Sequence, residues 1–127
     1  MEEIFHNKEL LGILVNDFEE GSVPLTDDKE CLQVLTLRHK AGEHTVAPHI
    51  HSPRKKETEK LQECLIVRKG RIKIDLYSSD GSYVKSMELK QGELFVRVSG
   101  GYGVKFLEDS EIFEIKNGPF NDDKVLI

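Results

Sequence analysis

The feature that most constrains the fold is a two-residue alternation of apolar and polar side chains. Over residues 71–77, Ile72, Ile74 and Leu76 alternate with charged and polar residues. Successive side chains of a strand point to opposite faces, so this pattern predicts a strand with one dry and one wet face. Gly70, directly before the segment, can adopt the positive φ that a tight hairpin turn requires. The segment is therefore predicted to be a strand that follows a hairpin turn.

Further short extended segments, separated by turn residues, fill the rest of the second half of the chain. Their ranges are residues 63–68, 83–89, 94–98, 104–107 and 112–116. Short strands punctuated at this spacing predict an all-β sandwich or barrel with little helix. In the first half, residues 32–38 favour a strand, whereas residues 10–15 fit either a strand or a buried helical turn. Residues 54–62 fit a single helical turn or an irregular loop.

The size and composition of the chain restrict its class. A chain of 127 residues with 38% hydrophobic and 32% charged residues is typical of a soluble globular protein, and residues 1–127 are expected to form one domain. No apolar run reaches the roughly 20 residues of a membrane span. A net charge of −5 argues against nucleic-acid binding, which needs a basic face. The basic cluster at residues 54–56 is followed by Glu57 and Glu59 and is expected to be a solvated loop.

The two cysteines, Cys31 and Cys64, form neither a CxxC pair nor a disulfide framework. Reduced thiols that pack as small apolar side chains are expected at both positions. The start of the chain is rich in Asp and Glu, whereas a secretory signal begins with basic residues and continues with an apolar stretch. These features predict a cytoplasmic protein.

His49 and His51 are the residues that most directly suggest a metal site. If residues 45–51 form a strand, the two imidazoles lie on one face with roughly 6–7 Å between their Cα atoms. Two imidazoles so placed can bind one ion, and neutral imidazole is a common ligand for zinc, iron, nickel, copper and manganese. Alone, a His-x-His pair also fits a surface pair or two core histidines.

Glu63 and Gly70 extend this pattern. Glu63 opens the next predicted strand, and six residues separate it from Gly70. This order of His-x-His, Glu and Gly resembles the first sequence motif of the cupin superfamily, in which the two His and the Glu bind metal inside a jelly-roll barrel. Residues 92–100 resemble the start of the second cupin motif, Gly-x5-Pro-x-Gly. The two regions cover about residues 42–107, and the resemblance implies a single-domain cupin jelly-roll β-barrel whose metal ligands are the His pair and Glu63.

Several short segments are similar to a narrower group of cupins. They are Gln62-Glu63, Gly70-Arg71, Asp75-Leu76-Tyr77, Ser99-Gly100-Gly101, Leu107-Glu108-Asp109 and Gly118-Pro119-Phe120. The group consists of small, functionally uncharacterised cupin metalloproteins associated with bacterial surface-polysaccharide synthesis. This resemblance implies a divalent transition metal (Zn, Fe, Mn or Ni) and a small, sugar-related ligand.

The chain departs from the cupin pattern in the spacing of the first motif and in the second motif, where Val98, Gly103 and Leu107 stand in place of the proline, the metal-binding His and the closing Asn. Eleven residues separate His51 from Glu63, where the general motif has three or four, although a longer loop costs little closure entropy. The narrower group has a further metal-binding His directly after a double glycine, where this chain has Tyr102. Tyr102 can bind the metal as a phenolate, hydrogen-bond to a metal-bound water, or mark a site that has lost its metal.

Arg97 is a weaker candidate for substrate binding. It lies on the same face of its predicted strand as Phe95, opposite the face that carries Leu94 and Val96. This placement predicts a solvated sheet face or, if that side faces the mouth of a barrel, a residue that binds an anionic substrate. The histidines outside the His-x-His pair have no ligand-like neighbours at useful spacing and are expected at the surface.

Three functions remain open at this point. The first is a metal-dependent enzyme acting on a small molecule, with open metal positions for water or substrate. The second is a non-catalytic binding or sensing protein for a sugar or another metabolite, which Tyr102 in place of a His favours. The third is a metal-free sugar-nucleotide isomerase or epimerase that transfers protons through a His and Tyr102. An open sheet edge also needs cover, so a homodimer is expected.

Overall fold

The structure is a computed structural model that describes residues 1–127 and contains ten strands and no helix. The strands are β1 (Glu2–His6), β2 (Glu9–Val15), β3 (Gly21–Pro24), β4 (Leu35–Arg38), β5 (Glu63–Lys69), β6 (Arg71–Tyr77), β7 (Tyr83–Lys90), β8 (Leu94–Arg97), β9 (Gly101–Phe106) and β10 (Glu111–Lys116). Every strand pairing is antiparallel. The structure contains no helix that could span a membrane.

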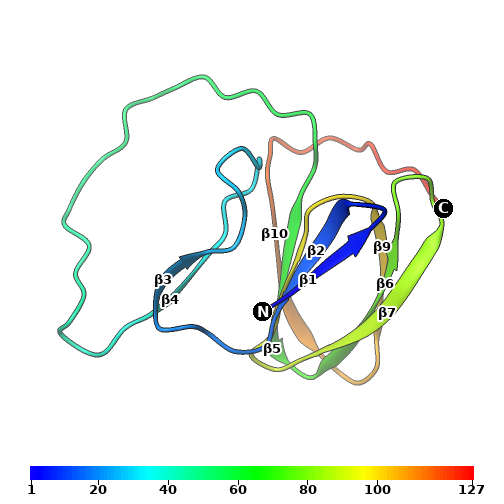
Figure 1. Cartoon of the computed structure of the whole chain (residues 1–127), viewed down its shortest axis with the longest axis horizontal. Helices are drawn as coiled ribbons and strands as arrows, with labels where there is room; N and C mark the ends of the chain where they lie inside the picture. The colour runs from blue at the N-terminus through cyan, green and yellow to red at the C-terminus, as the bar shows by residue number, and fades with distance from the viewer.

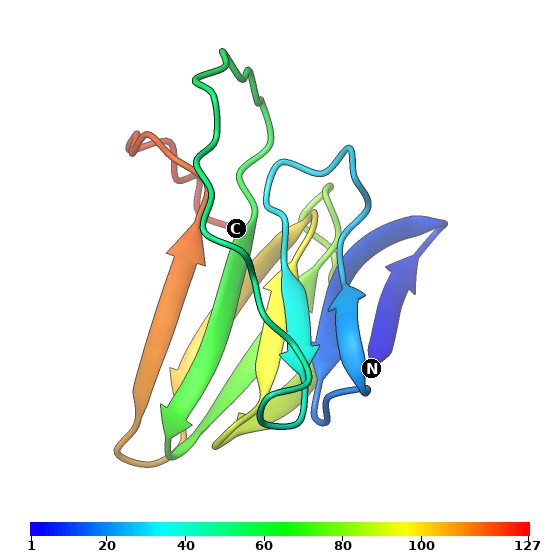
Figure 2. The ribbon, with the colours of Figure 1, turned by 90° about the vertical axis from the view of Figure 1, so that its left-hand side faces the viewer.

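The strands form two larger sheets and one hairpin. The larger sheet has five strands in the order β1-β2-β8-β5-β10, and a three-stranded sheet has the order β7-β6-β9. The third unit is the β3–β4 hairpin. Figure 1 shows β6, β7 and β9 on one side of the five-stranded sheet and the β3–β4 hairpin on the other, and in the turned view of Figure 2 the hairpin lies in front of that sheet. The five-stranded sheet is therefore the central layer.

The main core lies between the two larger sheets. Ile72, Ile74 and Leu76 of β6 are fully buried and pack with residues of the five-stranded sheet such as Leu65 and Phe95. The intervening residues of β6 are partly exposed, so the alternation predicted from the sequence is confirmed. Burial of these branched side chains stabilises the fold because each removes a large apolar area from water.

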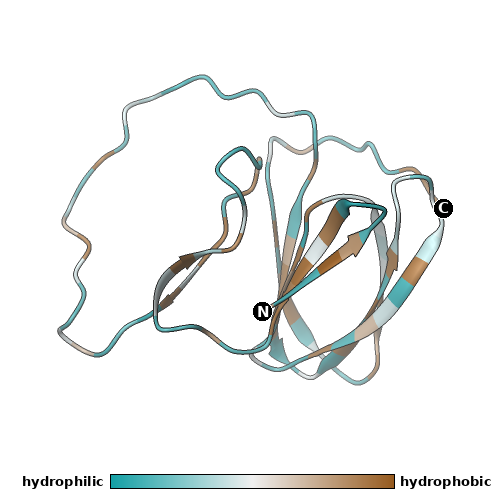
Figure 3. Ribbon diagram, in the orientation of Figure 1, coloured by the Kyte–Doolittle hydropathy of each residue, from teal (hydrophilic) through white to brown (hydrophobic).

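A second core covers the outer face of the five-stranded sheet. Ile13 of β2 and Val96 of β8 are buried there, and Leu25, Leu32 and Val34 pack over them from the segment around the hairpin. Figure 3 shows apolar residues on the β3–β4 hairpin as well as on β2. Because both faces of β2 are covered, its sequence is apolar without a period, which is why residues 10–15 fitted a helix as well as a strand.

Most of the predicted strands are confirmed, and the largest shifts are at the starts of two strands. The strand predicted from residue 32 begins at Leu35, because the residues before it leave the hairpin to cover the outer core. The strand predicted from residue 104 begins at Gly101, since the glycines continue the pairing with β6. Residues 54–62 are an irregular segment without a helical turn.

The hydrogen-bond ladders do not run on from one sheet into another. The all-β prediction with little helix is confirmed, but the structure shows packed antiparallel sheets without a closed barrel. The finer assignment to a cupin jelly roll stays a prediction.

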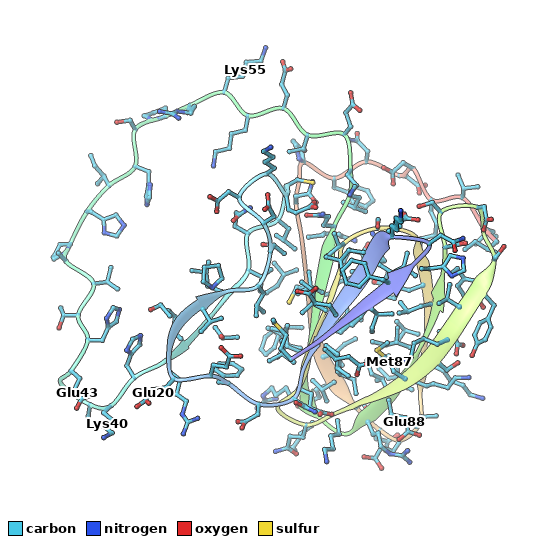
Figure 4. The ribbon with its side chains drawn as sticks, in the orientation of Figure 1. Glu20, Lys40, Glu43, Lys55, Met87 and Glu88 are labelled. Carbon is cyan, nitrogen blue, oxygen red and sulfur yellow. The ribbon has the colours of Figure 1, made fainter.

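The long connection between β4 and β5 lies outside the packed layers. Figure 1 shows it as a wide arc away from the sheets, and in Figure 4 the labelled side chains of Lys40, Glu43 and Lys55 stand on this arc. No hydrogen bond or ion pair joins residues 40–57 to the rest of the chain. The arc ends at the fully buried Gln62, which begins the packed region.

Candidate functional site

A cavity with both polar and apolar lining opens at one end of the two larger sheets. Its volume is about 1120 Å³, and its lining includes Glu63, Arg97 and Tyr102 together with the last residues of the chain, 116–127. Ligand pockets in proteins typically hold about 300–1,000 Å³. The cavity is thus large enough for a small molecule.

Strand register explains why three distant residues meet in this cavity. Glu63 opens β5 on the same face as the buried Leu65, and it stands directly opposite Arg97 of β8. Tyr102 stands opposite Leu76 in the β6–β9 ladder and therefore shares the inner face of the three-stranded sheet. Two facing sheets thus direct a carboxylate, a guanidinium and a phenol into the same space.

The three side chains are in direct contact. The Tyr102 hydroxyl donates a hydrogen bond to Oε2 of Glu63, and Nη2 of Arg97 lies 3.7 Å from Oε1 of the same carboxylate. The Arg97 guanidinium carbon also lies 5.3 Å from the centre of the Tyr102 ring. The side chains of Arg97 and Glu63 are only 11% and 10% exposed, so water screens their interaction weakly.

Backbone carbonyls hold Arg97 in place. Its Nη1 donates to the carbonyl of Gly100 at 2.9 Å, and its Nη2 donates to the carbonyl of Leu61 at 2.9 Å. Its Nε is the single buried side-chain nitrogen or oxygen in the structure that lacks a protein partner. A buried unpaired donor is costly, and this nitrogen has almost no surface accessible to solvent.

The electrostatics keep Tyr102 protonated. Burial raises the pKa of the Tyr102 phenol far above its ordinary value of about 10, and the Glu63 carboxylate raises it further, through the hydrogen bond and through its charge. Arg97 opposes this effect weakly. At neutral pH Tyr102 is therefore a hydrogen-bond donor in this arrangement.

Of the four residues predicted to bind metal, the structure brings two together. Glu63 and Tyr102 form the hydrogen-bonded pair, whereas His49 and His51 lie on the exposed arc. Residues 45–51 do not form the strand that would place both imidazoles on one face, because that segment has no strand partner and its residues are exposed. A strand needs a neighbour for its backbone groups, and residues 45–51 pair with no strand.

The two imidazoles remain close to each other. Their ring centres lie 5.0 Å apart in an edge-to-face arrangement, and Nδ1 of His49 is 2.8 Å from the Ala47 carbonyl. No group of three or more His, Cys, Asp or Glu side chains is placed to hold a metal ion. The oxygens of Glu63 face a phenol donor and a guanidinium, so the arrangement does not fit a cation. Metal binding by these residues stays a prediction.

Arg97 lies in the cavity instead of on a solvated sheet face. It shares the inner face of β8 with Phe95, which is fully buried. From the sequence, Arg97 fitted a solvated face of the strand because the opposite face carries the apolar Leu94 and Val96. Both faces of β8 are covered, so alternation cannot distinguish them.

Two residues that the sequence did not single out by their chemistry support the site. Gln62 accepts a hydrogen bond from the Leu32 N–H at 2.9 Å and donates to the Val98 carbonyl at 3.1 Å and to Glu30. Asn117 accepts the Gln62 N–H at 2.8 Å. Polar residues next to predicted strands are common, so no local pattern marks them.

Comparisons with family models, with curated proteins and with solved structures gave no match to this chain. The resemblance to cupins stays a prediction from the residue pattern.

Proposed function

We propose that this protein binds a small polar molecule in the cavity between its two larger sheets. The observation that carries the proposal is the cluster of Glu63, Arg97 and Tyr102, which combines an acceptor, a cation and a phenol at a cavity of about 1120 Å³. Binding sites commonly use a few convergent polar groups of this kind to orient a ligand.

The chemistry of the cluster favours a hydroxylated carboxylic acid, such as a sugar acid. Glu63 can accept hydrogen bonds from hydroxyl groups, and the positive charge of Arg97 in the cavity lining favours a carboxylate nearby. Tyr77, which also lines the cavity, adds an aromatic surface. A sugar-related ligand also agrees with what the cupin resemblance implies. The proposal includes binding and no catalytic step.

The test is a titration of the isotope-labelled protein, followed by NMR, with three compounds. Glucuronate carries hydroxyls and a carboxylate, glucose lacks the carboxylate, and cyclohexanecarboxylate lacks the hydroxyls. We expect glucuronate to shift the signals of Arg97 and Tyr102 most. Tyr102→Phe should weaken binding up to about tenfold, since it removes the hydrogen bond that orients the Glu63 carboxylate in the cavity.

Tyr83→Phe is the matched control, because the Tyr83 hydroxyl bonds to Ser86 at 2.7 Å on the exposed part of β7. An equal loss of affinity in both variants would contradict the proposal. So would signal shifts confined to the β3–β4 hairpin.

A metal-dependent function is the second candidate, and the adjacent rings of His49 and His51 favour it. It requires the arc to bring this pair to Glu63. Metal analysis of the protein purified without a His tag tests it. The expected result is about one equivalent of Zn, Fe, Mn or Ni, lost in His49→Ala and His51→Ala. Full metal content in both variants would exclude the predicted ligands.

A further inference from the structure

Residues 118–127 form one wall of the cavity without belonging to either sheet. They follow β10, and Figure 1 shows them running from β10 across the ends of the sheets to the turn between β6 and β7. Every one of these residues lines the cavity, together with Arg97 and Tyr102 of the candidate site. Residues 118–127 are called the strap below. The strap is therefore part of the boundary between the cavity and the solvent.

The near end of the strap has a fixed position. The side-chain oxygen of Asn117, directly before the strap, accepts the Gln62 N–H at 2.8 Å, and its amide group donates to the Lys60 carbonyl at 3.1 Å. Gln62 is itself fully buried at the entry to β5. These hydrogen bonds tie the start of the strap to the five-stranded sheet.

The far end of the strap rests on two glycines through the side chain of Ile127. A Cβ placed on Gly101 would lie 2.7 Å from Cδ1 of Ile127, and a Cβ placed on Gly81 would lie 3.6 Å from its Cγ2. Gly101 begins β9 and directly precedes Tyr102. The missing side chain at Gly101 thus leaves the space that Ile127 occupies beside the candidate site.

No polar contact holds the strap between its two ends. No hydrogen bond or ion pair involves residues 118–127, and none of them belongs to either hydrophobic core. Phe120, Val125 and Leu126 are 79%, 86% and 87% exposed. Segments with few buried contacts open at little cost in free energy, and the elements that move over binding sites are of this kind. The strap can therefore lift while both sheets stay folded.

We propose that the strap is a gate over the cavity, closed by the contact of Ile127 with Gly101 and Gly81, which lifts to admit and release the ligand. This inference rests on the proposed binding function of the cavity. Closure over a ligand would shield Val125 and Leu126 from water, and burial of apolar side chains stabilises the closed position. A ligand that contacts both the sheets and the strap thus favours the closed gate.

The accessibility of Tyr102 tests the gate without any ligand. A soluble gadolinium chelate speeds the NMR relaxation of the rings that it can approach. Removal of residues 119–127 should raise the effect of the chelate on the Tyr102 ring roughly twofold or more, because the cavity then opens to solvent. The Tyr83 ring on β7, which is 59% exposed, is the internal control and should keep its value. An unchanged effect on Tyr102 would overturn the proposal.

Ile127→Asp tests the far contact in the full-length chain. It replaces the apolar contact with Gly101 and Gly81 by a charged group, so it should also raise the effect of the chelate on Tyr102. The matched control is Ile50→Asp on the arc, where Ile50 is 94% exposed, and it should leave Tyr102 unchanged. Circular dichroism of all variants verifies that the sheets still form. No change in Ile127→Asp, or an equal change in both variants, would overturn the proposal.

The exchange rate of glucuronate separates the gate from the proposed function. Removal of residues 119–127 should raise the dissociation rate constant roughly tenfold, as measured by NMR line-shape analysis of the titration. Equal dissociation rate constants in the shortened and the full-length chain would overturn the gate. Failure of glucuronate to bind either protein would contradict the proposed ligand instead, and the accessibility of Tyr102 would still decide whether the strap closes the cavity.

Discussion

At the scale of single residues, the two cysteines have different environments. Cys64 is 2% exposed in the outer core, and burial raises the pKa of its thiol to about 11 from an ordinary 9.0. Cys31 is partly exposed, and its thiol donates to the Lys60 carbonyl at 3.0 Å. The expectation of a buried apolar thiol therefore fits Cys64, whereas Cys31 anchors the end of the arc.

The raised pKa of Cys64 predicts a loss of stability in alkali. The folded state holds the thiol proton more tightly than the unfolded state, so the contribution is complete below about pH 9 and declines as pH rises toward 11. We expect the free energy of unfolding of the wild type to fall in this window relative to that of Cys64→Ala, as measured by urea denaturation. A constant difference between the two proteins from pH 8 to pH 11 would contradict this assignment.

At the scale of elements, the turn between β8 and β9 positions the site. Gly100 has a φ of +72°, and a Cβ placed on it would lie 2.3 Å from the Tyr77 carbonyl oxygen. The carbonyl of Gly100 also accepts a hydrogen bond from Arg97. The backbone at this glycine thus sets how β9, and with it Tyr102, approaches Arg97.

Substitutions at three glycines separate conformational strain from crowding. Gly103 has open space around its Cβ position and no positive φ, Gly92 has open space with a φ of +85°, and Gly100 combines a positive φ with a clash. In urea denaturation we expect Gly103→Ala to change stability little, Gly92→Ala to cost about 1 kcal/mol and Gly100→Ala to cost about 3 kcal/mol. If Gly100→Ala costs no more than Gly92→Ala, the close approach of the turn to Tyr77 does not hold.

At the scale of the whole molecule, the arc between β4 and β5 is coupled to the sheets only at its ends. His39 lies 3.0 Å from the Ser22 hydroxyl at one end, and Asn117 holds the Lys60 carbonyl at 3.1 Å at the other. Between them the chain is exposed and forms only local contacts. Few buried contacts imply local opening at little cost in free energy.

Limited trypsin digestion measures this independence. Cleavage after Arg54, Lys55 or Lys56 should be roughly tenfold or more faster than cleavage after Lys73 in β6, because the arc needs no global unfolding to be cut. Zn²⁺ or Mn²⁺ should slow cleavage of the arc if His49 and His51 join Glu63 around an ion. His49→Ala/His51→Ala is the control in which added metal gives no protection. Initial cleavage within the sheets would show that the arc is not the most accessible segment.

The strands of the second half follow from the sequence, because alternation and turn glycines are local signals. The segment 71–77 has one buried and one exposed face, and its predicted bounds agree with β6. β2 and β8 are covered on both faces, so their period is hidden and neither the type of β2 nor the environment of Arg97 could be predicted. The alternation of apolar and polar residues cannot identify a strand when a third layer covers the face that would otherwise be exposed to solvent.

The sequence by itself determined the all-β class and most strand positions, and it singled out Arg97 as a candidate for substrate binding and Glu63 and Tyr102 as candidate metal ligands. Only the tertiary structure decided that these two meet, with Arg97 beside them, and that the arc places His49 and His51 apart from them. The physical reason is range. Side-chain alternation is set by neighbouring residues, whereas the meeting of β5, β8 and β9 depends on strand register across two packed sheets.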